Sequence, residues 1–164
     1  MHKKKWPNVP AVYDWLTLSR RGEWYIKDTR VNHKRLNTFL NKNYKVNSKG
    51  EWYVQNGPQN VFVNLEYTPL IARVQSNQFF ITQNNLKFTS VKRALMDEDG
   101  NLLLQGKKGI MLVDDRDLSQ LSNWIIAGKD SLSLSLENCV LAIEQCEKRK
   151  VPSLFNFVPE PTTS

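Results

Sequence analysis

Residues 50–69, GEWYVQNGPQNVFVNLEYTP, predict a β-hairpin and are the most regularly patterned stretch of the chain. Before the turn, Trp52 and Val54 alternate with polar or aromatic neighbours, and after it apolar residues alternate with Asn60, Phe62 and Asn64. Such a period of two is typical of strands with one buried face. The intervening Asn-Gly-Pro-Gln favours a turn, because glycine accepts a positive φ and proline stops a helix.

An earlier segment repeats this pattern. Gly22-Glu-Trp-Tyr-Ile26 resembles Gly50-Glu-Trp-Tyr-Val54, and with residues 11–18 it predicts a first hairpin. Two copies are too few for a stacked-repeat protein. We therefore expect a mostly antiparallel, meandering sheet, continued by strands over residues 70–75, 79–83, 94–96, 102–105 and 110–113.

Three helices complete the predicted α+β fold. The first is capped by Asn32 and carries an apolar stripe that ends at Tyr44, the second begins at Asp114 and ends before Gly128, and the third covers residues 137–149. Cys139 and Cys146 would share a face of the third helix as reduced core residues, about 10.5 Å apart along its axis.

Length and composition suit one domain. The chain has 164 residues, 40% of them hydrophobic and 24% charged, which is enough to bury a core. We expect a basic flexible tail over residues 1–7, one domain over residues 8–158, with the tail segment 151–158 docked on the sheet, and a frayed end over residues 159–164. Neither a secretory signal nor a membrane span is indicated, so a cytoplasmic location is expected.

Charge is concentrated in the first third. Residues 1–50 hold 12 Lys and Arg against 3 acidic residues, within a net charge of +7. Such a basic region could bind nucleic acid or simply solubilise the protein. The nucleic-acid hypothesis rests on basic residues interleaved with Tyr13, Trp15 and Tyr25: Arg20, Arg21, Lys34 and Arg35.

The sequence gives little support to catalysis. It has two histidines, no nucleophile elbow, no phosphate-binding loop and no cluster with metal-ligand spacing, so we expect neither a catalytic residue, nor a bound metal, nor a cofactor. Glu51 and Glu66 could pair across the second hairpin, but two surface acids are the simpler interpretation.

Several stretches resemble a family of small cytoplasmic proteobacterial proteins of unknown function. The resemblance is carried by residues 8–18, 21–24, 55–59, 65–69, 114–118 and 151–158, and Gln55-Asn-Gly-Pro-Gln59 is its most specific part. It implies no activity.

The preferred interpretation is a non-enzymatic binding or accessory module for a protein or a small ligand. Its candidate surface is the part of the second hairpin that core packing does not explain: Tyr53, Gln55, Asn56, Gln59, Phe62, Asn64 and Glu66. Phe62 could anchor a partner there or lie beneath the C-terminal tail. The oligomeric state is left open.

Overall fold

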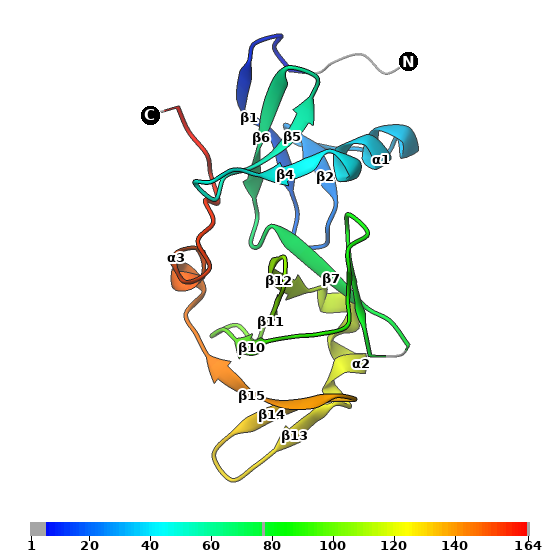
Figure 1. Ribbon diagram of the computed structural model, residues 1–164, viewed down its shortest axis with the longest axis vertical. Helices are drawn as coiled ribbons and strands as arrows, with labels where there is room; N and C mark the ends of the chain where they lie inside the picture. Colours follow the sequence, from blue (N-terminus) through cyan, green and yellow to red (C-terminus); the bar gives the residue numbers. More distant parts are fainter. Residues whose placement is uncertain (1–5, 77, 164) are drawn as a thin grey trace. The chain divides into compact units, whose positions relative to one another are not determined.

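The chain forms two compact units in the computed structural model, which describes residues 6–76 and 78–163 (Figure 1). Unit 1 comprises Met1–Pro69 and Asn156–Ser164, and unit 2 comprises Leu70–Phe155. Each unit is built around its own sheet.

Unit 1 contains a six-stranded sheet with the order β3-β2-β1-β6-β5-β4. Its strands are β1 (Ala11–Leu18), β2 (Trp24–Ile26), β3 (Thr29–Arg30), β4 (Tyr44–Val46), β5 (Trp52–Asn56) and β6 (Gln59–Leu65). Both predicted hairpins, β1–β2 and β5–β6, are confirmed. The two hairpins join through β1 and β6, which run parallel.

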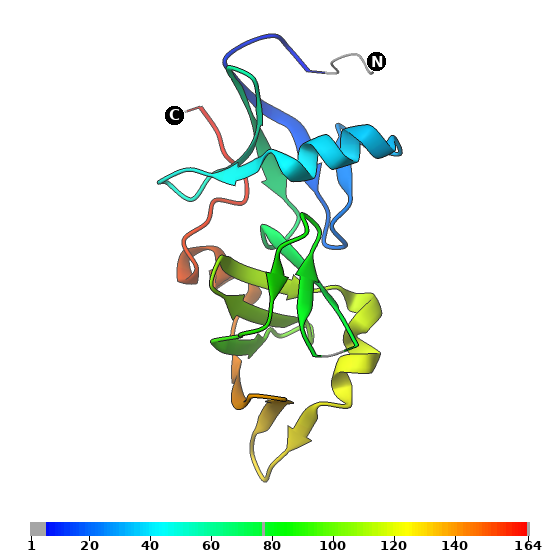
Figure 2. The same ribbon diagram turned by 45° about the vertical axis from the view of Figure 1, so that its right-hand side comes forward.

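One face of this sheet is covered by helix α1 (Lys34–Lys42), which crosses the strands in Figure 2. Leu40 is fully buried, and Asn41 Oδ1 accepts a 2.8 Å hydrogen bond from Trp24 Nε1. The apolar residues of the strands on this face form the core of the unit: Leu16, Leu18, Trp24, Val54, Val61, Val63 and Leu65.

The start of α1 differs from the prediction. His33, not Asn32, is the N-cap, since its Nδ1 accepts the backbone N–H of Leu36 at 3.4 Å. The helix also ends earlier than predicted, because Tyr44 pairs with Val54 as the first residue of β4.

The C-terminal segment lies between the diverging ends of β5 and β6. Val158 N donates to Gly50 O at 2.9 Å, Leu65 N donates to Pro159 O at 2.8 Å, and Val158 forms a parallel bridge with Glu51. Docking of the tail on the sheet is thereby confirmed at Val158. The inserted segment also means that Glu51 and Glu66 are not cross-strand neighbours, which corrects that hypothesis.

The predicted basic tail lies mostly outside the described residues, which begin at Trp6. The side chain of Trp6 is 8% exposed, and its Nε1 donates a 2.8 Å hydrogen bond to Gln59 Oε1. The segment expected to be flexible therefore contains an anchored residue, Trp6.

Unit 2 contains a nine-stranded sheet with the order β13-β14-β15-β10-β11-β12-β7-β8-β9. Its strands are β7 (Leu70–Val74), β8 (Phe80–Thr82), β9 (Lys87–Phe88), β10 (Arg93–Met96), β11 (Leu102–Gly106), β12 (Gly109–Val113), β13 (Ile125–Ala127), β14 (Leu132–Leu136) and β15 (Cys139–Gln145). Its α-helices are α2 (Leu118–Ser122) and α3 (Val151–Leu154), each preceded by a 3₁₀ turn. Leu102–Leu104 and Ile110–Val113 supply a nearly continuous buried core.

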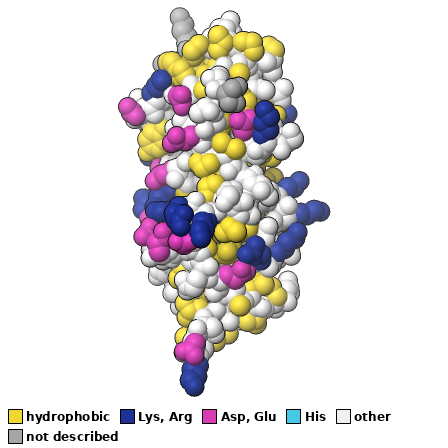
Figure 3. Space-filling view, turned by 90° about the vertical axis from the view of Figure 1, so that its left-hand side faces the viewer, with side chains coloured by type: hydrophobic (Ala, Val, Ile, Leu, Met, Phe, Trp, Pro, Cys, Tyr) yellow, Lys and Arg dark blue, Asp and Glu magenta, His cyan; other side chains and the backbone are white. Residues whose placement is uncertain are grey.

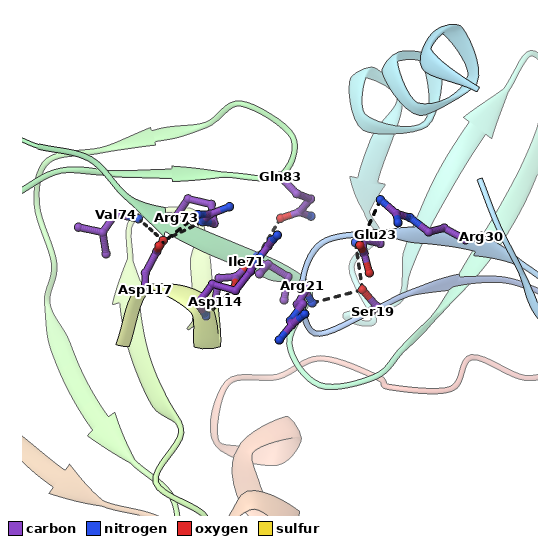
Figure 4. A network of polar contacts seen from close by, with 11 residues as sticks. Ser19, Arg21, Glu23, Arg30, Ile71, Arg73, Val74, Gln83, Asp114 and Asp117 are labelled. Carbon is purple, nitrogen blue, oxygen red and sulfur yellow. Dashed lines mark hydrogen bonds and ion pairs between the residues drawn. The ribbon is translucent and has the colours of Figure 1, made fainter. Parts of the chain in front are cut away.

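Asp117 fixes the turn before α2 to β7. It accepts hydrogen bonds from Arg73 Nε at 2.7 Å, Arg73 Nη2 at 3.1 Å and Val74 N at 2.9 Å (Figure 4). Burial alone would raise the pKa of Asp117, but the hydrogen bonds from Arg73 and Val74 outweigh it and lower the pKa below its ordinary value.

In this unit one helix prediction is wrong in part and another is wrong. The helix predicted to end before Gly128 stops at Ser122, because Ile125–Ala127 pairs with β14 as β13. Residues 139–145, predicted as helix, form strand β15 between β14 and β10. Cys139 is consequently exposed and Cys146 half-buried, not paired on a helix face.

The predicted fold class is confirmed. Among the described strands, three pairings are parallel (β1–β6, β10–β15 and β12–β7) and the others are antiparallel, with three short α-helices. No helix in the described part of the chain is long and apolar enough to cross a membrane.

Candidate functional site

The polar turn of the second hairpin serves the fold. Gln59 is 4% exposed, and its Nε2 donates to the carbonyls of Pro7 at 2.8 Å and Val9 at 2.7 Å. Its Oε1 accepts from Trp6 Nε1 and, at 3.2 Å, from Asn56 Nδ2. The amide of Gln59 thus holds the N-terminal segment against β6 and has little capacity left for a ligand.

Gln55 is engaged at the same end of the hairpin. Its Oε1 accepts a 2.7 Å hydrogen bond from Lys45 Nζ on the neighbouring strand β4. Gln55 lies on the opposite face of β5 from Asn56, because successive residues of a strand alternate. The seven candidate residues therefore do not form one surface.

Three of the candidates do lie together, on the sheet face opposite α1. Tyr53 and Phe62 are cross-strand partners with ring centroids 5.7 Å apart, and Asn64 follows Phe62 on the same face of β6. Tyr13 completes the group, since its ring stacks on Phe62 with a centroid distance of 4.8 Å and an interplanar angle of 4°. We call Tyr13, Tyr53, Phe62 and Asn64 the aromatic face.

A β-bulge places Tyr13 in this group. Val12 pairs with Val61 and Leu16 with Val63, so residues 13–15 of β1 lie opposite Phe62 alone. Asp14 at the centre of the bulge has φ +66°, which is uncommon outside glycine. The sequence did not predict Tyr13 as a neighbour of Phe62, because the alternating pattern of residues 11–18 gives no sign of a bulge.

Asn64 has the least satisfied side chain of the group. Its Nδ2 donates a long, 3.3 Å hydrogen bond to Asp14 Oδ1, whereas its Oδ1 is inaccessible to solvent and has no hydrogen-bond partner. Glu66 lies beyond the end of β6, where its Oε1 accepts the backbone N–H of Arg20 at 2.9 Å.

The four residues of the nucleic-acid hypothesis lie on two separate elements. Arg20 and Arg21 are in the turn between β1 and β2, and Lys34 and Arg35 are in the first turn of α1. On the face shown in Figure 3, acidic side chains lie directly beside basic ones. In unit 2, for example, Lys148 pairs with Asp99 at 2.8 Å and Lys150 with Glu147 at 2.7 Å.

Asp114, at the start of the 3₁₀ turn, also has its side chain engaged in contacts within the protein. Asp114 is fully buried, accepts the backbone N–H of Arg116 at 2.9 Å and pairs with its guanidinium at 2.6 Å. Within residues 6–76 and 78–163, no group of three or more His, Cys, Asp or Glu side chains is arranged to hold a metal ion.

Two solved structures have a similar fold. A DUF1285 family protein from Silicibacter pomeroyi DSS-3 aligns with a TM-score of 0.61 and 13% identity, covering 87% of this chain and 90% of that chain. Another DUF1285 family protein, from Shewanella baltica OS155, aligns with a TM-score of 0.51 and 13% identity, covering 67% of this chain and 91% of that one. At this identity the similarity shows the fold alone.

Sequence comparison identifies the family but no activity. No curated protein matches the chain. Residues 2–162 match the sequence profile of the family DUF2944, which is described as "Protein of unknown function (DUF2946)". Because this match covers nearly the whole chain, the protein belongs to that family.

Proposed function

We propose that the protein is a non-enzymatic binding module and that the aromatic face of unit 1 is its contact surface. The observation that carries this proposal is the stacked ring pair of Tyr13 and Phe62, which shares its sheet face with Asn64, a half-buried residue whose amide oxygen has no hydrogen-bond partner. A buried polar atom without a hydrogen-bond partner lowers the free energy of unfolding by about 1–3 kcal/mol.

The rings beside Asn64 suit a binding surface. Phe62 is 7% exposed, whereas Tyr13 and Tyr53 on either side of it are half-buried. Tyrosines offer a large apolar area together with a hydroxyl group, which is why they are enriched at interfaces. Phe62 therefore forms a rigid centre and the two tyrosines form the accessible rim. The expected alternative, burial of Phe62 beneath the tail, is not needed to explain its packing.

The backbone conformation of β1 is a further argument for a binding surface at the aromatic face. A non-glycine residue at positive φ costs on the order of 1 kcal/mol, and such conformations are concentrated at binding sites. Here the cost falls on Asp14, whose carboxylate contacts Asn64 and whose bulge places Tyr13 over Phe62.

A double variant tests this proposal. Tyr53→Ala with Asn64→Leu removes one ring of the rim and the amide group on the same face, and Lys49→Ala, an exposed turn residue, is the matched control. Proteins retained by the immobilised wild-type chain would be identified, purified and titrated against each form by calorimetry. We expect at least a tenfold loss of affinity for the double variant only, about 1.4 kcal/mol.

The control for folding is the urea midpoint of each variant. If the double variant unfolds like the wild type and still binds every partner with unchanged affinity, the aromatic face is not the contact surface.

We also propose that residues 8–158 form one folded domain and that the protein acts in the cytoplasm. The family match over residues 2–162 supports the first proposal. The free thiols of the exposed Cys139 and the half-buried Cys146 support the second, because cysteines persist unpaired in reducing compartments.

A further inference from the structure

A pocket of about 410 Å³ opens in unit 1 beside the start of α1. Ile26, Val31 and Leu36 line it with apolar surface, and Trp15 contributes an indole ring. The volume falls within the range of small-molecule sites, which are typically apolar with a few polar groups that orient the ligand. The pocket shares no residue with the aromatic face.

Lys27 occupies an unusual backbone position at this pocket. It is the first of the two residues that join the paired Ile26 and Thr29, and its φ is +54°, a conformation in which such turns favour glycine. Its N–H donates to Trp15 O at 2.8 Å, and its Nζ lies 4.3 Å from the centroid of the Trp15 ring. The strained turn therefore holds an ammonium group over the indole that lines the pocket.

Two further lining residues add positive or donating groups. Arg30 is exposed and pairs with Glu23 at 3.2 Å through one of its terminal nitrogens, Nη2. His33 accepts the Leu36 N–H at Nδ1, so a neutral ring carries its proton on Nε2 as a donor. None of the nine described residues lining this pocket is acidic.

We propose that this pocket binds a small planar organic anion, an aromatic carboxylate, with its ring on the apolar surface near Trp15 and its carboxylate beside Lys27 and Arg30. The apolar lining favours a ring over a fully hydrated inorganic ion. The excess of donors selects a negative charge, and guanidinium and ammonium groups form strong hydrogen bonds with carboxylates.

A panel of three acids and a neutral analogue tests the chemical class. Benzoate, indole-3-carboxylate and 2-naphthoate would be titrated into the full chain by calorimetry, alongside 2-naphthamide. We expect saturable binding of at least one bicyclic acid with a Kd below about 1 mM, and at least tenfold weaker binding of the amide. Absence of saturable binding by all three acids, or equal affinity for naphthoate and naphthamide, would overturn the proposal.

Variants locate the bound acid. Lys27→Gly removes the ammonium group and suits the positive φ, so the turn should be preserved while affinity falls at least tenfold. Lys49→Ala should bind like the wild type. A Lys27→Gly protein that binds the acid unchanged would place the anion elsewhere and refute the proposal.

The Tyr53→Ala, Asn64→Leu protein separates the two proposals. It should bind the aromatic acid unchanged, because it leaves every residue of the pocket intact. A parallel loss of acid binding in that variant would show that the pocket does not act as an independent site, and would overturn the assignment to Lys27 and Arg30.

Discussion

The Gln55–Gln59 turn and the Lys27–Asp28 turn are both polar turns of unit 1, yet they use their polar groups in opposite ways. Gln59 is buried, and its amide hydrogen bonds hold the N-terminal segment in place. Lys27 is exposed, has a strained backbone and places its ammonium group at a pocket. A polar residue in a turn is therefore evidence of a site only when its burial and its partners leave it available.

The largest expected effect tests how firmly the second hairpin holds the tail. A methyl group at Gly50 would clash with the carbonyl oxygen of Asn156, and the φ of +81° is itself unfavourable for alanine. Gly50→Ala should lower the free energy of unfolding by about 3 kcal/mol. Urea denaturation measures this, with Gly57→Ala as the control, because that glycine also has positive φ but an open environment. Equal losses in both would show that strain, not the tail contact, governs Gly50.

The next effect concerns Gln59 itself. Gln59→Ala leaves the indole N–H of Trp6 and the carbonyls of Pro7 and Val9 without their side-chain partner, so stability should fall by about 2 kcal/mol. Gln55→Ala is the matched control and should change stability by less than about 0.5 kcal/mol, because its partner Lys45 is exposed. A Gln59→Ala protein as stable as the wild type would remove the distinction between the two turns.

Asp117 is a charged residue whose hydrogen bonds, like those of Gln59, stabilise the fold. Asp117→Ala breaks the pair with Arg73 and leaves the Val74 N–H unpartnered, at a cost of about 1–2 kcal/mol near neutral pH. Since the folded-state pKa of Asp117 is lowered, its contribution is present above the unfolded pKa of about 4 and is lost as the pH falls through the folded value. Urea midpoints of wild type and variant should therefore converge below about pH 4, and a constant difference would contradict the ion pair.

The smallest expected effect has the opposite sign. Lys27→Gly relieves an unfavourable φ of +54°, at the cost of the Lys27–Trp15 contact, and should raise the free energy of unfolding by up to about 1 kcal/mol. A gain in thermal stability together with a loss of acid binding would mark Lys27 as a residue kept for function. Destabilisation would instead mean that the contact with Trp15 outweighs the strain.

The local patterns that predicted the fold correctly were those with a period of two. Trp52, Val54, Val61, Val63 and Leu65 all belong to the buried core, as their alternation indicates. Alternation and turn residues are local properties, so the sequence determined both hairpins, the strands β7, β8, β10, β11 and β12, and the α+β class.

Tertiary structure alone decided where the secondary structure differs from the one that the local sequence favours. Residues 139–145 have apolar spacing that suits a helix, but β14 and β10 offer ladder partners on both sides, and the hydrogen bonds of those ladders override local propensity. Ile125–Ala127 likewise leaves the predicted helix to pair with β14.

The candidate sites divide in the same way. The sequence by itself indicated that Tyr53, Phe62 and Asn64 share one face of the second hairpin, since residues alternate along each of its two strands. Only the tertiary structure brought Tyr13 onto Phe62, buried Gln59 against Trp6 and placed Lys27 over Trp15. Those contacts depend on a bulge, a docked terminus and a turn with positive φ, whose partners lie elsewhere in the chain and leave no periodic signal.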